Sequence, residues 1–585
     1  MESVSGKAFD FDLLKRVFRY ALPYKTVFSL GLFLTIILAF TAPLRPWLIQ
    51  YTFDNYILVP NALGLLRMTL IIFSLLIIES GIQFCNTYLT NWLGQSVISD
   101  LRLSIYRHII NFKLKYFDRT AIGTLVTRAV SDIETIAEVF SQGFLIIIGD
   151  ILQLIVIIIV MFYTDWRLAL ISLSTLPLLI FSTSVFKNAI KKAFQDVRTQ
   201  VARLNAFVQE NITGMSIIQI FNREESELNK FKRINNLHKK AHIQTVWIFS
   251  IFFPVVEILS AISLGLLVWW GTRGVLEGSV TLGSLIAFIL YIYMLFRPIR
   301  QLADRFNALQ MGMVGSERVF RIFDTDETIK DQGTLSNESI RGNVKFKNVW
   351  FAYNEQDWVL KDLNFEVKEG ETFAIVGATG AGKTSIINIL SRLYEINKGE
   401  IIIDNINAKE YTLEALRGSI AVVLQDVFLF SDSILNNIRL NNTQITKKHV
   451  KEAAKKVGIH DLIEKLPGGY QFDVRERGSM LSLGQRQLIS FLRAYVNDPK
   501  ILVLDEATSS IDSETEQLVH NAIQQLTTNR TSIIIAHRLS TIQAADQIIV
   551  MDQGKIVETG NHEELLKLNG YYNRLYELSL IKESH

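Results

Sequence analysis

The sequence predicts an N-terminal all-α domain that crosses a membrane several times, followed by an α/β domain. Three observations support this prediction. The chain has 585 residues, which is too long for one ordinary hydrophobic core. Its hydrophobic content is 49%, and the long apolar runs are concentrated between residues 25 and 300. Residues 340–585 instead have the composition of a soluble domain, with a glycine-rich loop between an apolar run and a helical pattern.

Six apolar segments are candidate membrane helices, since about 20 apolar residues cross a hydrocarbon core of about 30 Å. They cover residues 25–52, 65–94, 136–163, 168–186, 246–270 and 282–297. The loops after the second and fourth segments are long, roughly 40 and 60 residues, and their apolar residues recur at helical spacing, as at Ile105 and Ile109. We therefore expect these membrane helices to continue far beyond the membrane before they turn back.

Loop charges predict the orientation of the helices. The two long loops are rich in lysine and arginine, whereas the loop at 53–65 contains neither. By the positive-inside rule, the long loops, both termini and the α/β domain are cytoplasmic. Residues 1–24 mix charged and aromatic residues, which predicts an amphipathic elbow helix on the membrane surface. The net charge of +3 gives no indication of a nucleic-acid partner, and the single cysteine, Cys85, excludes an intrachain disulfide.

The glycine-rich loop is typical of a phosphate-binding site. It follows the apolar run 373–376, opens the helical pattern 385–390, and consists of Gly377, Ala378, Thr379, Gly380, Ala381, Gly382, Lys383 and Thr384, with Ser385 next. Glycines allow backbone N–H groups to turn towards phosphates, and the helix N-terminus adds positive potential. Lys383 is placed to reach the β- and γ-phosphates, and the Thr384 hydroxyl to bind Mg²⁺. The loop therefore predicts binding of a nucleoside triphosphate.

Further polar residues follow apolar runs in an order that suits hydrolysis. Residues 501–504 form an apolar run that ends at Asp505 and Glu506. A buried strand would present these acids beside the phosphate loop, Asp505 to hold Mg²⁺ through water and Glu506 to polarise the attacking water. Gln425 follows the run 420–424 and is predicted to sense both the metal and the neighbouring domain, and His537 follows 532–536 and is predicted to contact the γ-phosphate. Taken alone, Gln425 or His537 would more often be an ordinary loop residue. The order of all these motifs along the chain is hard to explain by chance.

The stretch Leu481-Ser482-Leu483-Gly484-Gln485 identifies the class, because it resembles the signature of the ATP-binding cassette (ABC) family. The resemblance extends over residues 342–585 and implies a P-loop α/β nucleotide-binding domain with a helical subdomain. It also implies that Tyr353 stacks on adenine and that 509–512 is the D-loop. The family's signature, here Ser482, Gly484 and Gln485, closes over nucleotide held by a second cassette. Since the phosphate loop and signature of one chain cannot meet each other, the resemblance implies that two chains pair.

The membrane half resembles the six-helix exporter type, with residues 116–128 and 214–225 similar to its two coupling-helix regions. The implied organisation is an elbow at 1–24, a membrane domain at 25–305, a linker at 306–341 and a nucleotide-binding domain at 342–585. The implied function is ATP-driven export or flipping of amphipathic, lipophilic, drug-like molecules by alternating access, in a bacterial inner membrane. A lipid translocase would share every motif. An ATP-gated channel or regulatory subunit is less favoured, because a gate needs ATP binding more than the hydrolysis that Glu506 serves.

Two features leave alternatives open. Leu483 occupies the signature position where the family usually has glycine, which resembles one subunit of two-subunit exporters and slightly favours a heterodimer; a homodimer that tolerates leucine is the alternative. Three acids, Glu79, Asp150 and Glu257, fall inside the predicted spans. Such residues usually face a bundle interior or a watery cavity, so they predict either a partly acidic cavity that favours cationic amphiphiles or hydrogen bonding between packed helices.

Overall fold

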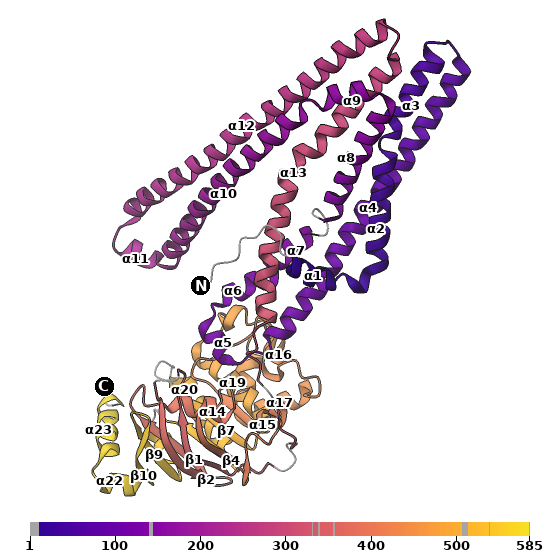
Figure 1. Cartoon of the computed structure of the whole chain (residues 1–585). Coiled ribbons are helices and arrows are strands. Elements are labelled where there is room, and N and C mark those ends of the chain that lie inside the picture. The colour runs from indigo at the N-terminus through magenta and orange to yellow at the C-terminus, as the bar shows by residue number, and fades with distance from the viewer. Residues whose placement is uncertain are drawn as a thin grey trace. The chain divides into compact units, whose positions relative to one another are not determined.

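The computed structural model describes residues 11–139, 144–329, 331–336, 340–354, 357–505, 513–536 and 539–583 (Figure 1). The chain divides into two compact units. The first contains Met1–Ile110 and Ala121–Asp326, and the second contains Asn111–Thr120 and Glu327–His585. The short segment Asn111–Thr120 therefore belongs to the C-terminal unit, although the residues on both sides of it belong to the N-terminal unit.

The first unit is all-α, as the sequence predicts. Its helices are α1 (Phe11–Arg19), α2 (Lys25–Thr41), α3 (Leu44–Thr52), α4 (Ala62–Ile109), α6 (Ile122–Thr127), α7 (Ile133–Glu138), α8 (Leu145–Thr164), α9 (Trp166–Leu173), α10 (Leu176–Thr213), α11 (Met215–Ile220), α12 (Glu224–Leu276) and α13 (Leu282–Phe323). Helices α10 and α12 pack side by side, and the short α11 joins their ends (Figure 1).

Several of these helices are far longer than a membrane requires. Helix α4 has 48 residues and α12 has 53. At about 1.5 Å per residue each is more than twice as long as a hydrocarbon core of about 30 Å is thick. The predicted extensions of the membrane helices are thus confirmed.

Among the described residues, five segments are long and apolar enough to cross a membrane. They are Leu22–Ile57, Ala62–Ile109, Leu145–Thr164, Trp166–Thr213 and Glu224–Leu276. The sixth expected span corresponds to the shorter apolar stretch Leu282–Pro298, which begins α13. The third expected span starts later than expected, because residues 133–138 form the separate helix α7.

Helix α1 packs against the C-terminal part of α13, the last helix of the same unit. Leu14 and Val17 are buried, and Leu14 belongs to a cluster with residues of α13. Arg16 donates two hydrogen bonds to the Asp324 carboxylate, at 2.7 and 2.8 Å, and lies over the Phe320 ring at 4.4 Å. The N-terminal helix is therefore attached to the last turns of α13.

The second unit contains two sheets. The antiparallel sheet has the order β2-β1-β4-β5, and the larger sheet has the order β10-β9-β3-β8-β7-β6. The strands are β1 (Val344–Phe351), β2 (Leu360–Val367), β3 (Thr372–Gly377), β4 (Lys398–Ile403), β5 (Ile406–Asn407), β6 (Ile420–Val423), β7 (Ile501–Asp505), β8 (Thr531–Ile535), β9 (Gln547–Asp552) and β10 (Lys555–Gly560). Strands β9, β3, β8, β7 and β6 pair in parallel, so their carboxyl ends lie at one edge of the sheet.

The helices of this unit are α5 (Leu114–Arg119), α14 (Lys383–Leu390), α15 (Leu413–Ser419), α16 (Ile434–Arg439), α17 (Lys447–Val457), α18 (His460–Glu464), α19 (Leu483–Val496), α20 (Ser513–Thr527), α21 (Leu539–Gln543), α22 (His562–Lys567) and α23 (Tyr571–Glu583). Side chains of β3 alternate between two cores, as a pleated strand requires. Phe373 and Ile375 join the core of the antiparallel sheet, whereas Ala374 and Val376 join the core formed with α16, α17 and α19. The predicted α/β domain with a helical subdomain is confirmed.

Candidate nucleotide-binding site

The glycine-rich loop runs from the end of β3 to the start of α14, as the sequence predicts. Two of its glycines are required by geometry. A Cβ atom at Gly377 would lie 2.3 Å from the Met551 carbonyl oxygen. Gly382 has a φ of +100°, and a Cβ there would lie 2.7 Å from a methyl carbon of Leu360. A side chain at Gly377 would therefore collide with the backbone, and one at Gly382 would be strained by the positive φ, so both positions favour glycine.

The Lys383 side chain lies inside this loop. It is 7% exposed, and its ammonium donates to the carbonyl oxygens of Gly377 at 2.6 Å and Ala378 at 3.1 Å. Burial lowers the pKa of Lys383, and the nearby Asp505 carboxylate offsets part of this effect. A buried ammonium held on the inner wall of the loop is placed to bind phosphate oxygens.

Asp505 and Thr384 face each other at the carboxyl edge of the parallel sheet. Asp505 ends β7 and is 5% exposed, and the Thr384 hydroxyl donates to its carboxylate at 3.3 Å. Gln425 is exposed and lies two residues beyond β6, whose Val423 pairs with Leu504 of β7. The structure thus places the phosphate loop, Asp505 and the Gln425 segment at one edge. Glu506, the stretch 509–512 and His537 lie outside the described residues.

Tyr353 contacts α14 through its hydroxyl group. The oxygen lies 3.1 Å from the Ser385 hydroxyl and accepts a hydrogen bond from the Asn388 amide at 3.1 Å. Its ring packs edge-on against Phe351 and Tyr394, with centroids 4.7 and 5.0 Å apart. Sequence reasoning missed Asn388 and Tyr394, because neither belongs to a motif and only the fold brings them to Tyr353.

The signature segment forms the start of α19. Ser482 caps the helix: its hydroxyl accepts from the Gln485 backbone N–H at 3.2 Å, and the Gln485 side chain accepts from the Ser482 N–H at 3.0 Å. The expectation that Ser482 begins a helix is confirmed. Leu483 follows at the first helical position and is 39% exposed, while Gly484 is buried. Among the described residues, no hydrogen bond joins residues 482–485 to the phosphate loop.

A cavity of about 350 Å³ lies within the helical unit and is lined by two of the three acids found in the predicted spans. Glu79 pairs with Arg45 at 3.4 Å, and Asp150 pairs with Arg305 at 3.2 Å. Glu257 does not line this cavity, whereas Arg297 does. The described lining thus holds three arginines and two acids. The hypothesis of an acidic cavity is wrong for this site, because arginines from other helices neutralise both carboxylates.

These features define an ATP-binding α/β domain joined in one chain to a polytopic membrane domain. Residues 28–299 match the ABC transporter transmembrane region family, and residues 360–509 match the ABC transporter family. The chain belongs to the ABC transporters. It has one membrane domain and one ATPase domain, which makes it a half-transporter that works as a dimer with another half-transporter.

Proteins of several bacteria are similar to this chain over almost its whole length. An uncharacterized ABC transporter ATP-binding protein, YknV of Bacillus subtilis, is 36% identical over 575 residues, covering 98% of this chain and 95% of that one. An ATP-dependent lipid A-core flippase of Syntrophus aciditrophicus is 33% identical, covering 97% and 94% of the two chains. A solved structure of a bacterial Atm1-family ABC exporter with ATP bound has a TM-score of 0.77 and 25% identity, covering 97% of this chain and 99% of that one. The predicted exporter fold is confirmed.

Proposed function

We propose that this chain uses ATP to export or flip amphipathic, lipophilic molecules across the bacterial plasma membrane by alternating access. The observation that carries the proposal is the buried Lys383 inside the phosphate loop, beside Asp505, in a chain whose membrane unit encloses a charged cavity. ATP binds the closed pair of cassettes better than the open pair, and this difference in affinity drives the conformational change. Glu506, Gln425 and His537 complete the hydrolytic site.

Mg²⁺ fits the oxygen atoms at the sheet edge. The Thr384 hydroxyl and the Asp505 carboxylate face each other at 3.3 Å, and Gln425 offers an amide oxygen from the neighbouring strand end. Hard oxygen donors of this kind suit Mg²⁺, which usually keeps several waters and also binds substrate phosphates. When bound, the ion would neutralise charge that develops on the phosphates. Thr384, Asp505 and Gln425 are the residues that would hold it.

The partner is a second half-transporter, and exposed apolar side chains support pairing. On α11, Ile217 and Ile220 are exposed, and Phe221 just beyond the helix is exposed too. In the nucleotide-binding unit, Phe428 and Phe430 are exposed as well. Exposed apolar clusters of this kind are typical of surfaces that another chain covers.

Leu483 favours a heterodimer in which the partner supplies an intact signature. Its side chain is exposed at the first turn of α19, where backbone N–H groups would otherwise be open to a γ-phosphate. We expect the chain purified alone to hydrolyse ATP slowly, and Leu483→Gly and Leu483→Ala to raise the rate about tenfold or more. The alanine variant controls for the helix propensity that glycine lowers. Rapid ATPase activity of the unaltered chain alone, with no gain in either variant, would favour a homodimer.

The membrane cavity is the proposed substrate site. Its ion pairs and amides suit the polar head of an amphiphile, while neighbouring apolar helices suit the tail. Glu79→Gln together with Asp150→Asn removes two negative charges and leaves Arg45 and Arg305 without these partners. ATPase stimulation by a cationic dye and by an anionic amphiphile is measured in lipid nanodiscs. We expect the double variant to lower the ratio of cationic to anionic stimulation several-fold.

Glu257→Gln is the matched control, since Glu257 lies in a predicted span but does not line the cavity. It should leave the ratio of stimulation as in the unaltered protein. An unchanged ratio in the double variant, or an equal shift in the control, would place the substrate elsewhere.

A lipid translocase is the second candidate, favoured by the polar cavity lining and by relatives that are named lipid A-core flippases. A lipid extract that stimulates the ATPase more than dyes do would select it. Transport measurements in inverted vesicles distinguish an ATP-gated channel from an exporter. A channel would give passive current and no ATP-dependent accumulation. Cytoplasmic placement of both termini, proposed from the loop charges, predicts that the ATPase domain faces outward in such vesicles.

A further inference from the structure

The segment Asn111–Thr120 contacts the rest of the nucleotide unit near both of its ends. At its start, the Lys113 N–H donates to the Glu327 carbonyl oxygen at 2.8 Å, and Phe112 forms a β-bridge with Thr328. At its end, Arg119 donates to the Asn354 side chain at 3.2 Å. This segment lies in the chain between the long helix α4 and α6, which both belong to the membrane unit. A displacement of the segment would therefore pull directly on the ends of membrane-domain helices.

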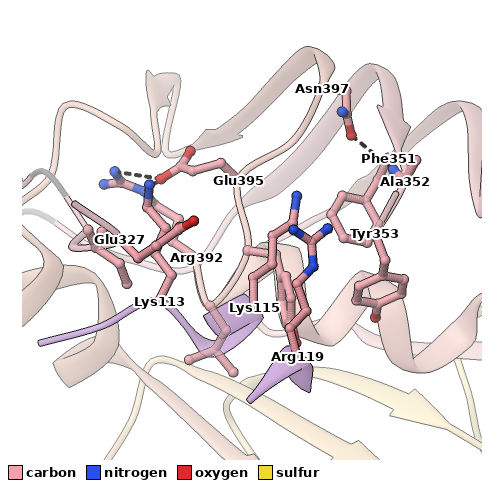
Figure 2. Close-up of a pocket in the computed structure, with 13 residues that line it drawn as sticks. Lys113, Lys115, Arg119, Glu327, Phe351, Ala352, Tyr353, Arg392, Glu395 and Asn397 are labelled. Atoms are coloured by element: carbon pink, nitrogen blue, oxygen red, sulfur yellow. Dashed lines mark hydrogen bonds and ion pairs between the residues drawn. The ribbon is translucent and has the colours of Figure 1, made fainter. Parts of the chain in front are cut away.

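A pocket of about 240 Å³ is lined by Lys115 and Arg119 of this segment and by Tyr353, which lies two residues beyond the end of β1. In Figure 2, Lys115 and Arg119 point into the space between Tyr353 and Glu395. Beside this pocket, side chains connect the segment directly with the residues around Tyr353.

One such connection is the hydrogen bond from Tyr394 to Asp118. The Tyr394 hydroxyl donates to the Asp118 carboxylate, and the Tyr394 side chain is only 8% exposed. Burial, and secondly this hydrogen bond, raise the pKa of Tyr394, so the hydroxyl stays protonated and remains a donor. A hydrogen bond to a charged acceptor is among the stronger single contacts in proteins.

The other side of Tyr394 touches Tyr353. The two rings meet edge-on at 5.0 Å, with an interplanar angle of 87°. The Tyr353 hydroxyl is in turn bonded to Ser385 and Asn388 on α14, next to the phosphate loop. The Tyr353 ring lies between α14 and Tyr394, so a base that stacks on it shifts the ring within this space. In a close-packed region such a shift also displaces the neighbouring Tyr394 ring.

We propose that Tyr394 is a positioning residue that relays the presence of the nucleotide base from Tyr353 to Asp118, and so to the segment Asn111–Thr120. The inference rests on the proposed function, because it assumes that the adenine stacks on Tyr353. It adds that the base, rather than the phosphates alone, controls the segment Asn111–Thr120, and that one hydroxyl group carries this signal.

Hydrogen–deuterium exchange on the full-length protein in nanodiscs tests the relay without knowledge of the substrate. ADP and pyrophosphate are compared at saturation, since both lack the γ-phosphate that would seal two cassettes, and only ADP has a base. Exchange in residues 377–390 reports occupancy of the phosphate loop. We expect ADP to change the exchange rate of residues 111–120 about tenfold, the size of effect of one charged hydrogen bond, and pyrophosphate to leave it unchanged.

Tyr394→Phe keeps the ring and removes the hydroxyl group. In this variant ADP should still protect residues 377–390 but no longer affect residues 111–120. Asp118→Ala should behave in the same way, whereas Asp118→Asn, which keeps an acceptor oxygen, should retain part of the effect. Tyr572→Phe is the matched control, because it removes another buried hydroxyl, bonded to His562 at 2.7 Å, and should behave as the unaltered protein.

Two results would overturn the relay: an undiminished effect of ADP in Tyr394→Phe, or an equal effect of pyrophosphate in the unaltered protein. A failure of the proposed function looks different. In that case ADP would not protect residues 377–390 at all, and the nucleotide site would be lost together with the relay.

Discussion

Replacing Lys383 with alanine should lower kcat for ATP hydrolysis by about 10²–10³-fold, the usual cost of removing one preorganised charge from a transition state. The ammonium is buried, and its two hydrogen bonds hold it on the carbonyl oxygens of Gly377 and Ala378. It is therefore already in place when negative charge develops on the transferred phosphoryl group. Alanine leaves that charge without a counterpart in a site from which water is largely excluded.

The measurement is steady-state phosphate release in nanodiscs, with ATP affinity determined separately. Lys345→Ala is a suitable control, because Lys345 lies in the same domain but pairs with Glu366 at 46% side-chain exposure. It should hydrolyse ATP at the unaltered rate. Turnover near the unaltered rate in Lys383→Ala would refute the assigned phosphate site.

Replacing Glu506 with glutamine should abolish hydrolysis while ATP still binds, and should trap the closed pair of cassettes. Glu506 directly follows Asp505, which ends β7 at the sheet edge beside the phosphate loop. Glutamine has the same shape but cannot accept a proton from the attacking water, so we expect kcat to fall by about 10²–10⁴-fold. Binding should remain, because Lys383, Thr384 and Asp505 are unchanged.

Trapping is measured as nucleotide retained after gel filtration, together with cross-linking between cassettes. Glu369→Gln, at an exposed position in the turn between β2 and β3, removes the same charge far from the reaction and should neither trap nor slow the protein. If Glu506→Gln hydrolysed ATP normally, the base would have to be another residue, and His537 would be the next to test.

Motifs formed by residues that are close in the sequence made much of the structure predictable. The phosphate loop, its strand and its helix follow one another in the chain, so the glycine spacing was sufficient to place Lys383 and Thr384. The apolar run before Asp505 predicted a buried strand, and the parallel sheet confirms it. Ser482 was expected to begin a helix, and it caps α19. In each case the interacting groups are close in sequence and leave a local pattern.

Contacts between distant residues left no such pattern. The acids Glu79 and Asp150 were visible as charges in apolar segments, but their arginine partners come from other helices. The sequence therefore left an acidic cavity and bonding between packed helices as alternatives, and the described lining of this cavity contradicts the first. Likewise, Asp118 and Tyr394 are 276 residues apart, and neither belongs to a periodic pattern. The amino-acid sequence by itself determined the two domains, the long helices and the chemistry of the phosphate loop, because these depend on local spacing and hydrophobicity. Only the tertiary structure decided which charges are neutralised and which side chains connect the nucleotide site to the segment at 111–120, because packing alone brings those groups together.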